Sequence, residues 1–151
     1  MKKILVCEDE AAIRDFVVIN LTRAGYDVVE ADCGEAALQK YEENNGDFDV
    51  AILDVMMPGI DGFQVCKELR NRNGGIGIIM LSAKTQEMDK VTGLMLGADD
   101  YVTKLSHRVS FLQELIHSTE ELRLHSHIPK TTLKKSLNRA SSHSIFATVH
   151  L

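Results

Sequence analysis

The sequence predicts an α/β domain in which helices cover both faces of a five-stranded, doubly wound parallel sheet. Three observations lead to this prediction. Short apolar runs alternate with stretches of helical periodicity over residues 1–104. The apolar runs are continuous, which is typical of strands that are buried on both faces. Glycine and asparagine residues separate successive elements. Alternating strands and helices of this kind favour a parallel sheet.

Each element has its own justification in the sequence. The strands are short runs of mostly apolar residues, expected at 3–7, 26–31, 50–53, 77–81 and 101–103. The helices repeat apolar residues at intervals of three or four and are expected at 11–24, 34–43, 63–70 and 86–96. Gly25 and Gly97 stand where the first and the fourth helix should end. Pro58-Gly59 marks a loop before the third helix.

The composition fits one domain of ordinary size. Of the 151 residues, 44% are hydrophobic and 26% are charged. No apolar run approaches the roughly 20 residues that span a bilayer, and no signal peptide is evident. Cys7, Cys33 and Cys66 are widely spaced, so we expect reduced cysteines and a cytoplasmic protein. The net charge of −5 gives no general case for binding nucleic acid.

The composition changes abruptly between Lys104 and Leu105. Residues 1–104 carry 11 Lys and Arg against 19 Asp and Glu, whereas residues 105–151 carry 6 against 3. All ten glycines lie in the first segment and all six histidines lie in the second. We therefore expect a boundary at this point.

Polar side chains stand at the carboxyl ends of four expected strands. Glu8 and Asp9 follow the first strand, Asp54 the third, Ser82 the fourth and Lys104 the fifth. Because parallel strands end at one edge of a sheet, we expect these side chains to converge there. Carboxylates packed together repel unless a cation lies among them, and their oxygens suit Mg²⁺, which also takes phosphate as a ligand. A lysine and a hydroxyl beside that ion would hold phosphoryl oxygens, so the set indicates phosphoryl transfer.

Four motifs follow one another along residues 1–104. They are Val6-Cys7-Glu8-Asp9-Glu10, Leu53-Asp54-Val55-Met56-Met57-Pro58-Gly59-Ile60-Asp61-Gly62, Leu81-Ser82-Ala83-Lys84 and Gly97-Ala98-Asp99-Asp100-Tyr101-Val102-Thr103-Lys104. With these motifs the sequence resembles the receiver domain of bacterial two-component response regulators, with the character of the OmpR/PhoB subfamily. The resemblance implies a flavodoxin-like (CheY-like) fold with strand order 2-1-3-4-5.

The resemblance implies a function for the acidic residues. Asp54 would be the nucleophile that accepts a phosphoryl group from a phosphohistidine on a sensor histidine kinase. Asp9, Asp54 and the backbone carbonyl of Met56 would ligate Mg²⁺, and Glu8 would act through a water molecule. The chain would then be a phosphoacceptor with self-catalysed transfer and autodephosphorylation, and not an enzyme in the usual sense.

The resemblance also implies a conformational switch. Ser82 would bind the phosphoryl group, Lys104 would pair with it, and Tyr101 would turn inward as Ser82 moves. In the OmpR/PhoB subfamily, homodimers form through the fourth helix, the fifth strand and the fifth helix, so an altered tail would weaken pairing here.

Leu105 stands where the family has a proline after the lysine. A cis bond before a residue other than proline costs about 2.5–4 kcal/mol, so we expect a trans Lys104–Leu105 bond, and the sequence leaves the direction of Lys104 open. Family members often continue Pro-Phe-Ser-Pro-Ser-Glu-Leu. Deleting the first base of one DNA sequence that encodes this stretch shifts the reading frame. The shifted frame encodes Leu-Ser-His-Arg-Val-Ser-Phe, which is the sequence of residues 105–111. We hypothesise that residues 105–151 are a frameshifted tail; the coding DNA tests this.

The tail has limited structural content of its own. Apolar residues recur at helical spacing, so a helix over about 108–124 could dock in place of the last receiver helix. Disorder is expected for the rest. His125 and His127 are a weak indication of metal binding, and the basic residues of 130–139 a weak indication of nucleic-acid binding. No DNA-binding output domain fits in this segment, so DNA binding is not expected.

Alternatives remain open at the residue and the functional level. Asp54 could be a loop carboxylate that caps a turn, and Glu8 and Asp9 could be an acidic cluster that the helix dipole favours at a helix N-terminus. Ser82 could be an ordinary turn hydroxyl, and Tyr101 could serve only to pack the core. The chain could be a stand-alone single-domain receiver that absorbs phosphoryl groups. It could also be a Mg²⁺-dependent phosphoaspartate hydrolase, although that class needs an aspartate where Met56 stands. A nucleotide-binding domain is disfavoured because no Gly-x-Gly-x-x-Gly follows the first strand.

Overall fold

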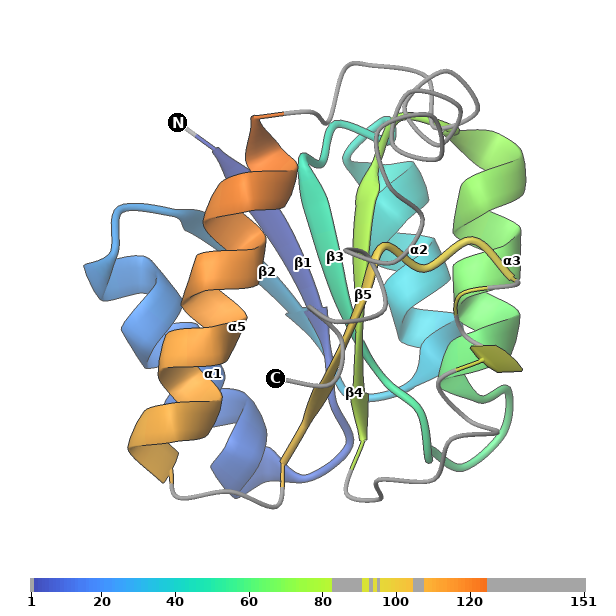
Figure 1. Cartoon of the computed structure of the whole chain (residues 1–151). Helices are drawn as coiled ribbons and strands as arrows, with labels where there is room; N and C mark the ends of the chain where they lie inside the picture. Colours follow the sequence, from blue (N-terminus) through green and yellow to red (C-terminus); the bar gives the residue numbers. More distant parts are fainter. Residues whose placement is uncertain (1, 83–90, 93, 95, 105–107, 125–151) are drawn as a thin grey trace.

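The computed structural model describes residues 2–82, 91–92, 94, 96–104 and 108–124. Five parallel strands form one sheet in the order β2-β1-β3-β4-β5 (Figure 1). The strands are β1 (Lys3–Cys7), β2 (Asp27–Ala31), β3 (Val50–Asp54), β4 (Gly77–Ser82) and β5 (Asp100–Thr103). The predicted fold class and the predicted strand order are therefore confirmed.

Four helices with defined bounds cover the sheet. They are α1 (Ala11–Arg23), α2 (Gly34–Glu43), α3 (Gly62–Arg72) and α5 (Arg108–Arg123). Figure 1 shows α1 and α5 on one face of the sheet and α2 and α3 on the other. Most of the predicted helix over 86–96 falls outside the described residues, as does everything after 124.

The core consists of two apolar layers separated by the sheet. The layer on the α2 and α3 side contains Leu5, Leu53 and Met80 from the strands and Leu69 from α3. The layer on the α1 and α5 side contains residues from the strands and from both helices. They are Ile4, Val6, Ile52, Ile79, Leu81 and Val102 from the strands, Val17 and Leu21 from α1, and Leu115 from α5. Every residue of β3 and β4 is buried, which explains why their sequences lack polar alternation.

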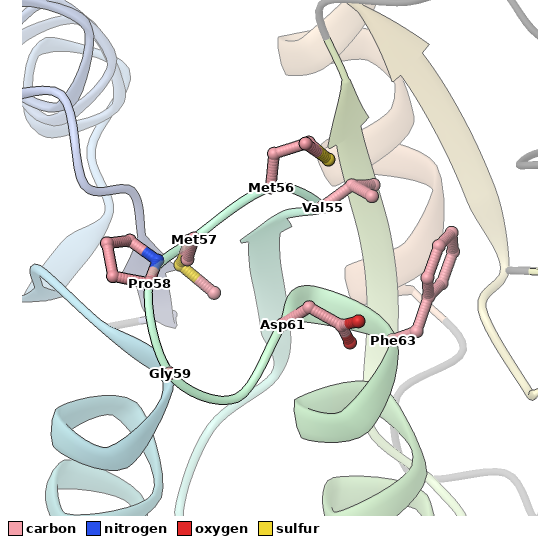
Figure 2. A pocket seen from close by; sticks show the side chains of 7 residues that line it. All are labelled: Val55, Met56, Met57, Pro58, Gly59, Asp61 and Phe63. Carbon is pink, nitrogen blue, oxygen red and sulfur yellow. The ribbon is translucent and has the colours of Figure 1, made fainter.

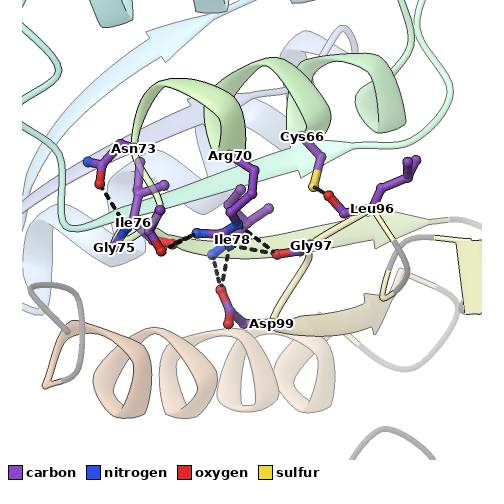
Figure 3. A network of polar contacts seen from close by, with 10 residues as sticks. Cys66, Arg70, Asn73, Gly75, Ile76, Ile78, Leu96, Gly97 and Asp99 are labelled. Atoms are coloured by element: carbon purple, nitrogen blue, oxygen red, sulfur yellow. Dashed lines mark hydrogen bonds and ion pairs between the residues drawn. The ribbon is translucent and has the colours of Figure 1, made fainter. Parts of the chain in front are cut away.

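Arg70 ties the amino-terminal end of β4 to the segment before β5 (Figure 3). Its guanidinium donates to the carbonyl oxygens of Gly97, at 2.6 and 3.1 Å, and of Ile76, at 2.6 Å. It also pairs with Asp99 at 3.0 Å, and Asp99 in turn accepts the backbone N–H of Ile78 at 2.8 Å. One side chain therefore satisfies backbone groups from two neighbouring segments.

The predicted element bounds differ slightly from the observed ones. Asp54 and Ser82 are the last residues of β3 and β4, whereas the sequence analysis placed each of them just after its strand. The third helix begins one residue earlier than predicted, because Asp61 caps it by accepting the N–H of Gln64 at 2.9 Å. It also ends two residues later than predicted. No helix among the described residues is long and apolar enough to cross a membrane.

Candidate functional site

The strand ends bring the predicted site residues to one edge of the sheet. Cys7, which precedes Glu8, is level with Leu53, which precedes Asp54. Asp54 is level with Leu81 in β4, and Ser82 is level with Thr103 in β5. Parallel pairing therefore places the ends of four strands side by side, as the sequence predicted.

Three carboxylates meet at this edge. Glu8, Asp9 and Asp54 each offer an oxygen, and these oxygens all lie within 4.8 Å of one another. Glu8 is fully buried, Asp54 is 3% exposed and Asp9 is partly exposed. The cluster is thus buried at Glu8 and Asp54 and reaches solvent at Asp9.

Lys104 points into the carboxylate cluster. Its Nζ atom lies 2.8 and 2.9 Å from the two carboxylate oxygens of Glu8 and 3.0 Å from Oδ1 of Asp54. The sequence left the direction of Lys104 open, and the structure directs its ammonium toward Glu8 and Asp54. The Lys104 backbone N–H donates to the Ser82 carbonyl at 2.7 Å, so β5 pairing is maintained up to this residue and fixes its orientation. The expectation of a trans bond involves Leu105, which lies outside the described residues.

The charges at this edge perturb one another. Burial is the main cause that raises the pKa of Asp54 to about 7, with further contributions from Asp9 and Glu8, while Lys104 acts in the opposite direction. Burial alone would lower the pKa of Lys104, but its bonds to Glu8 and Asp54 outweigh that effect and raise it. Three carboxylates against one ammonium leave an excess of negative charge. A hard divalent cation such as Mg²⁺ fits these oxygen donors.

The loop between β3 and α3 follows Asp54 directly along the chain. A hollow of about 520 Å³ beside this loop is lined by Val55, Met56, Met57, Pro58, Gly59, Asp61 and Phe63 (Figure 2). The Met56 side chain is 63% exposed. Gly62 packs so closely under β3 that a Cβ there would lie 2.1 Å from the carbonyl oxygen of Asp54. Glycine at this position therefore lets α3 begin directly beside the acidic cluster.

Ser82 and Tyr101 occupy neighbouring strands. Ser82 is 1% exposed at the end of β4, next to the strand that carries Asp54. Tyr101 is 1% exposed in β5 and packs in the layer on the α2 and α3 side. Its ring is therefore turned inward in this structure.

A comparison with known families decides the identity of the fold. The sequence model of the family described as the response regulator receiver domain matches residues 4–116. The chain belongs to this family. The match extends past Lys104 into α5, so the receiver domain in this protein includes part of that helix.

Curated relatives of this receiver domain are transcriptional regulators. The alkaline phosphatase synthesis transcriptional regulatory protein PhoP of Bacillus subtilis is 52% identical over 103 residues, which are 68% of this chain and 42% of that protein. A probable transcriptional regulatory protein of Picosynechococcus is 40% identical over 149 residues, covering 95% of this chain and 58% of that protein. The chain thus spans about half the length of these relatives. The predicted similarity to OmpR/PhoB-type regulators is confirmed.

Solved receiver domains have the same fold. The receiver domain of the Francisella response regulator 1452 aligns with a TM-score of 0.71 and 34% identity, covering 82% of this chain and 97% of that one. The response regulator TrrA of Thermotoga maritima, solved in complex with Mg²⁺ and beryllium fluoride, aligns with a TM-score of 0.67 and 36% identity. It covers 79% of this chain and 99% of that one.

Two side chains that support the receiver site were not predicted. Arg14 of α1 donates to the carbonyl oxygen of Glu8 at 2.8 Å. Glu35 of α2 accepts the backbone N–H of Ile60 at 2.9 Å and so holds the loop between β3 and α3. Both are charged residues in the first turns of helices, and nothing in the sequence pattern separates them from ordinary solvent-facing charges.

Proposed function

We propose that the chain is a phosphorylation-dependent signalling module in which Asp54 accepts a phosphoryl group from a phosphohistidine of a sensor histidine kinase. The observation that carries this proposal is the convergence of Glu8, Asp9 and Asp54 within 4.8 Å, with Lys104 at 3.0 Å from Asp54. Family membership supports the same proposal, since the matched family is that of response regulator receivers.

The carboxylates supply a donor set that suits Mg²⁺. Asp9 and Asp54 would bind the ion directly, with the backbone carbonyl of Met56, and Glu8 would act through water. Bound Mg²⁺ would neutralise the charge that develops on the transferred phosphoryl oxygens. Burial mainly, and the neighbouring Asp9 and Glu8 in addition, raise the pKa of Asp54, and a bound cation would favour its ionised form. An oxygen-rich, open-sided cluster of this kind fits a hydrated ion.

The transfer itself requires little covalent chemistry from the chain. A carboxylate oxygen of Asp54 attacks phosphorus, a P–O bond forms, the P–N bond to the donor histidine breaks and its electron pair returns to the imidazole. Lys104 now bridges Glu8 and Asp54. When Asp54 becomes an acyl phosphate, the same ammonium can pair with a phosphoryl oxygen while it keeps its contact with Glu8.

The conformational switch would involve the strands next to Asp54. Ser82 ends the strand next to Asp54, and a new dianionic group there would attract its hydroxyl. Tyr101 on the next strand is already buried, so the signal would alter the packing around a ring that is turned inward. We propose Ser82 and Tyr101 as switch residues on this basis.

Residues 105–151 are proposed to supply α5 and no DNA-binding domain. The frameshift origin of this segment remains our hypothesis. Homodimerisation through the face of the fourth helix and β5 is proposed to be weak, because α5 departs from the family pattern. A single-domain receiver that absorbs phosphoryl groups remains the alternative. The hydrolase alternative is disfavoured because Met56 stands where that class needs a second aspartate.

Small-molecule phosphorylation tests the proposal. The chain is incubated with acetyl phosphate and Mg²⁺, and its intact mass is followed over time. We expect one phosphoryl adduct, which does not form when EDTA removes the Mg²⁺ and does not form in Asp54→Asn. Asp47→Asn alters an exposed aspartate and is the control that still forms the adduct. Continuous release of phosphate without an adduct would instead identify a hydrolase.

A further inference from the structure

Arg14 joins the loop that carries the acidic cluster to the neighbouring strand. Its Nη1 atom donates to the carbonyl oxygen of Glu8 at 2.8 Å, and its Nε atom donates to Oε1 of Glu30 in β2 at 3.1 Å. The Arg14 side chain is 18% exposed. Because the two bonds use separate donors of one planar guanidinium, they fix the position and the direction of that plane.

These contacts hold the peptide from which Asp9 projects. The Glu8 carbonyl belongs to the peptide bond between Glu8 and Asp9, so a bond to this oxygen sets the orientation of that peptide. The Glu8 backbone N–H is held as well, since it donates to the carbonyl of Ala31 at 3.1 Å. The backbone that presents two acidic side chains is therefore fixed without occupying their carboxylates.

We propose that Arg14 is a positioning residue for the Mg²⁺ site, an inference that rests on the function proposed above. Two effects of Arg14 on cation binding oppose each other. A positive charge beside the carboxylates repels a divalent cation, so its removal alone would tighten binding. Loss of the tie frees the peptide of Glu8 and Asp9 and weakens binding. Glu30 offsets the charge of Arg14, so positioning is the larger effect.

Arg14→Lys separates these two effects. Lysine keeps the positive charge, but it lacks the planar fork that reaches Glu8 and Glu30 together. Binding of Mn²⁺ alone to the full chain, followed through the electron paramagnetic resonance signal of the free ion, reports the site without any phosphorylation. We expect Arg14→Lys to weaken binding about tenfold. Arg72→Lys, which alters surface ion pairs with Glu42 and Glu68, is the control and leaves binding unchanged.

A thermal melt of the metal-free variants distinguishes positioning from a general loss of stability. A lower melting temperature for Arg14→Lys with unchanged Mn²⁺ affinity would make Arg14 a purely structural residue and overturn the inference, and tighter binding would do the same. Either result leaves the proposed function intact if the wild type binds Mn²⁺ and is phosphorylated. A wild-type chain that binds no Mn²⁺ would overturn both. Glu30→Gln, which weakens the same tie from its other end, is expected to reduce affinity less than Arg14→Lys does.

Discussion

At the scale of single residues, the buried carboxylates carry a cost that their function explains. Asp54 has a pKa of about 7 in the folded chain, mainly because of burial, against an ordinary value of 3.8. Glu8 is fully buried and compensated by Lys104. A site selected for stability alone would not gather three acids around one lysine. The arrangement fits a site that binds a cation and then a phosphoryl group.

Asp54→Asn should therefore stabilise the metal-free protein at high pH. Because the pKa is raised on folding, the folded state keeps its proton to higher pH, and stability falls as pH rises from roughly 4 to 7. We expect the melting temperature of Asp54→Asn to exceed that of the wild type by about 4 °C at pH 8. The difference should vanish toward about pH 3, which lies below both pKa values. Asp47→Asn, on the surface, should show no such pH dependence.

Lys104→Met should have the opposite effect. It removes the partner of a fully buried Glu8, and an uncompensated buried charge is strongly unfavourable. We expect the free energy of unfolding, measured in urea at pH 8 without metal, to fall by about 3 kcal/mol. Added Mg²⁺ should recover part of this loss. An unchanged urea midpoint, or a loss equal to that of the exposed Lys40→Met, would refute the buried ion pair.

At the scale of elements, close packing of α3 under β3 sets the geometry of the site. A Cβ on Gly62 would lie 2.1 Å from the Asp54 carbonyl oxygen, whereas a Cβ on Gly74 would meet nothing within 4 Å. Gly62→Ala should cost about 2 kcal/mol and slow phosphorylation, since the backbone of Asp54 must shift. Gly74→Ala should leave both unchanged. Urea unfolding and the rate of adduct formation provide the two measurements.

The second element that matters is α5, which packs on the same face of the sheet as α1. Leu115 is fully buried between α5 and the sheet, and Ser118 hydrogen-bonds Asp100 while Glu120 hydrogen-bonds Tyr26. Leu115→Ala should lower the free energy of unfolding by about 3 kcal/mol. Gln113→Ala, on the exposed side of the same helix, should leave it nearly unchanged. Equal effects would mean that α5 does not pack on the sheet.

At the scale of the whole molecule, periodicity and turn residues were enough to predict the layers and the five strands, whereas the strand order was implied by the resemblance to receiver domains. The prediction worked because the strands of this sheet are continuous apolar runs, as in Val50–Asp54 and Gly77–Ser82. The edge that would hold the site followed from the polar residues at the strand ends. Glu8, Asp9, Asp54 and Lys104 do meet there.

Other features could not be predicted, for physical reasons. Arg14 and Arg70 donate to backbone carbonyls that lie 6 and 27 residues away along the chain, and such contacts leave no periodicity in the sequence. The direction of Lys104 could not be predicted because the proline that follows this lysine in the family is missing here. Pairing of β5 with β4, through the Lys104 N–H and the Ser82 carbonyl, was not visible in the local sequence.

The central claim is that the carboxylate of Asp54 becomes an acyl phosphate. The most direct test is to phosphorylate the chain with acetyl phosphate and Mg²⁺, reduce the acyl phosphate with borohydride and map the product by peptide mass spectrometry. We expect homoserine at position 54 and unmodified aspartate at position 9 and at the other positions. Reduction at another aspartate, or none despite full exposure to the donor, would contradict the account.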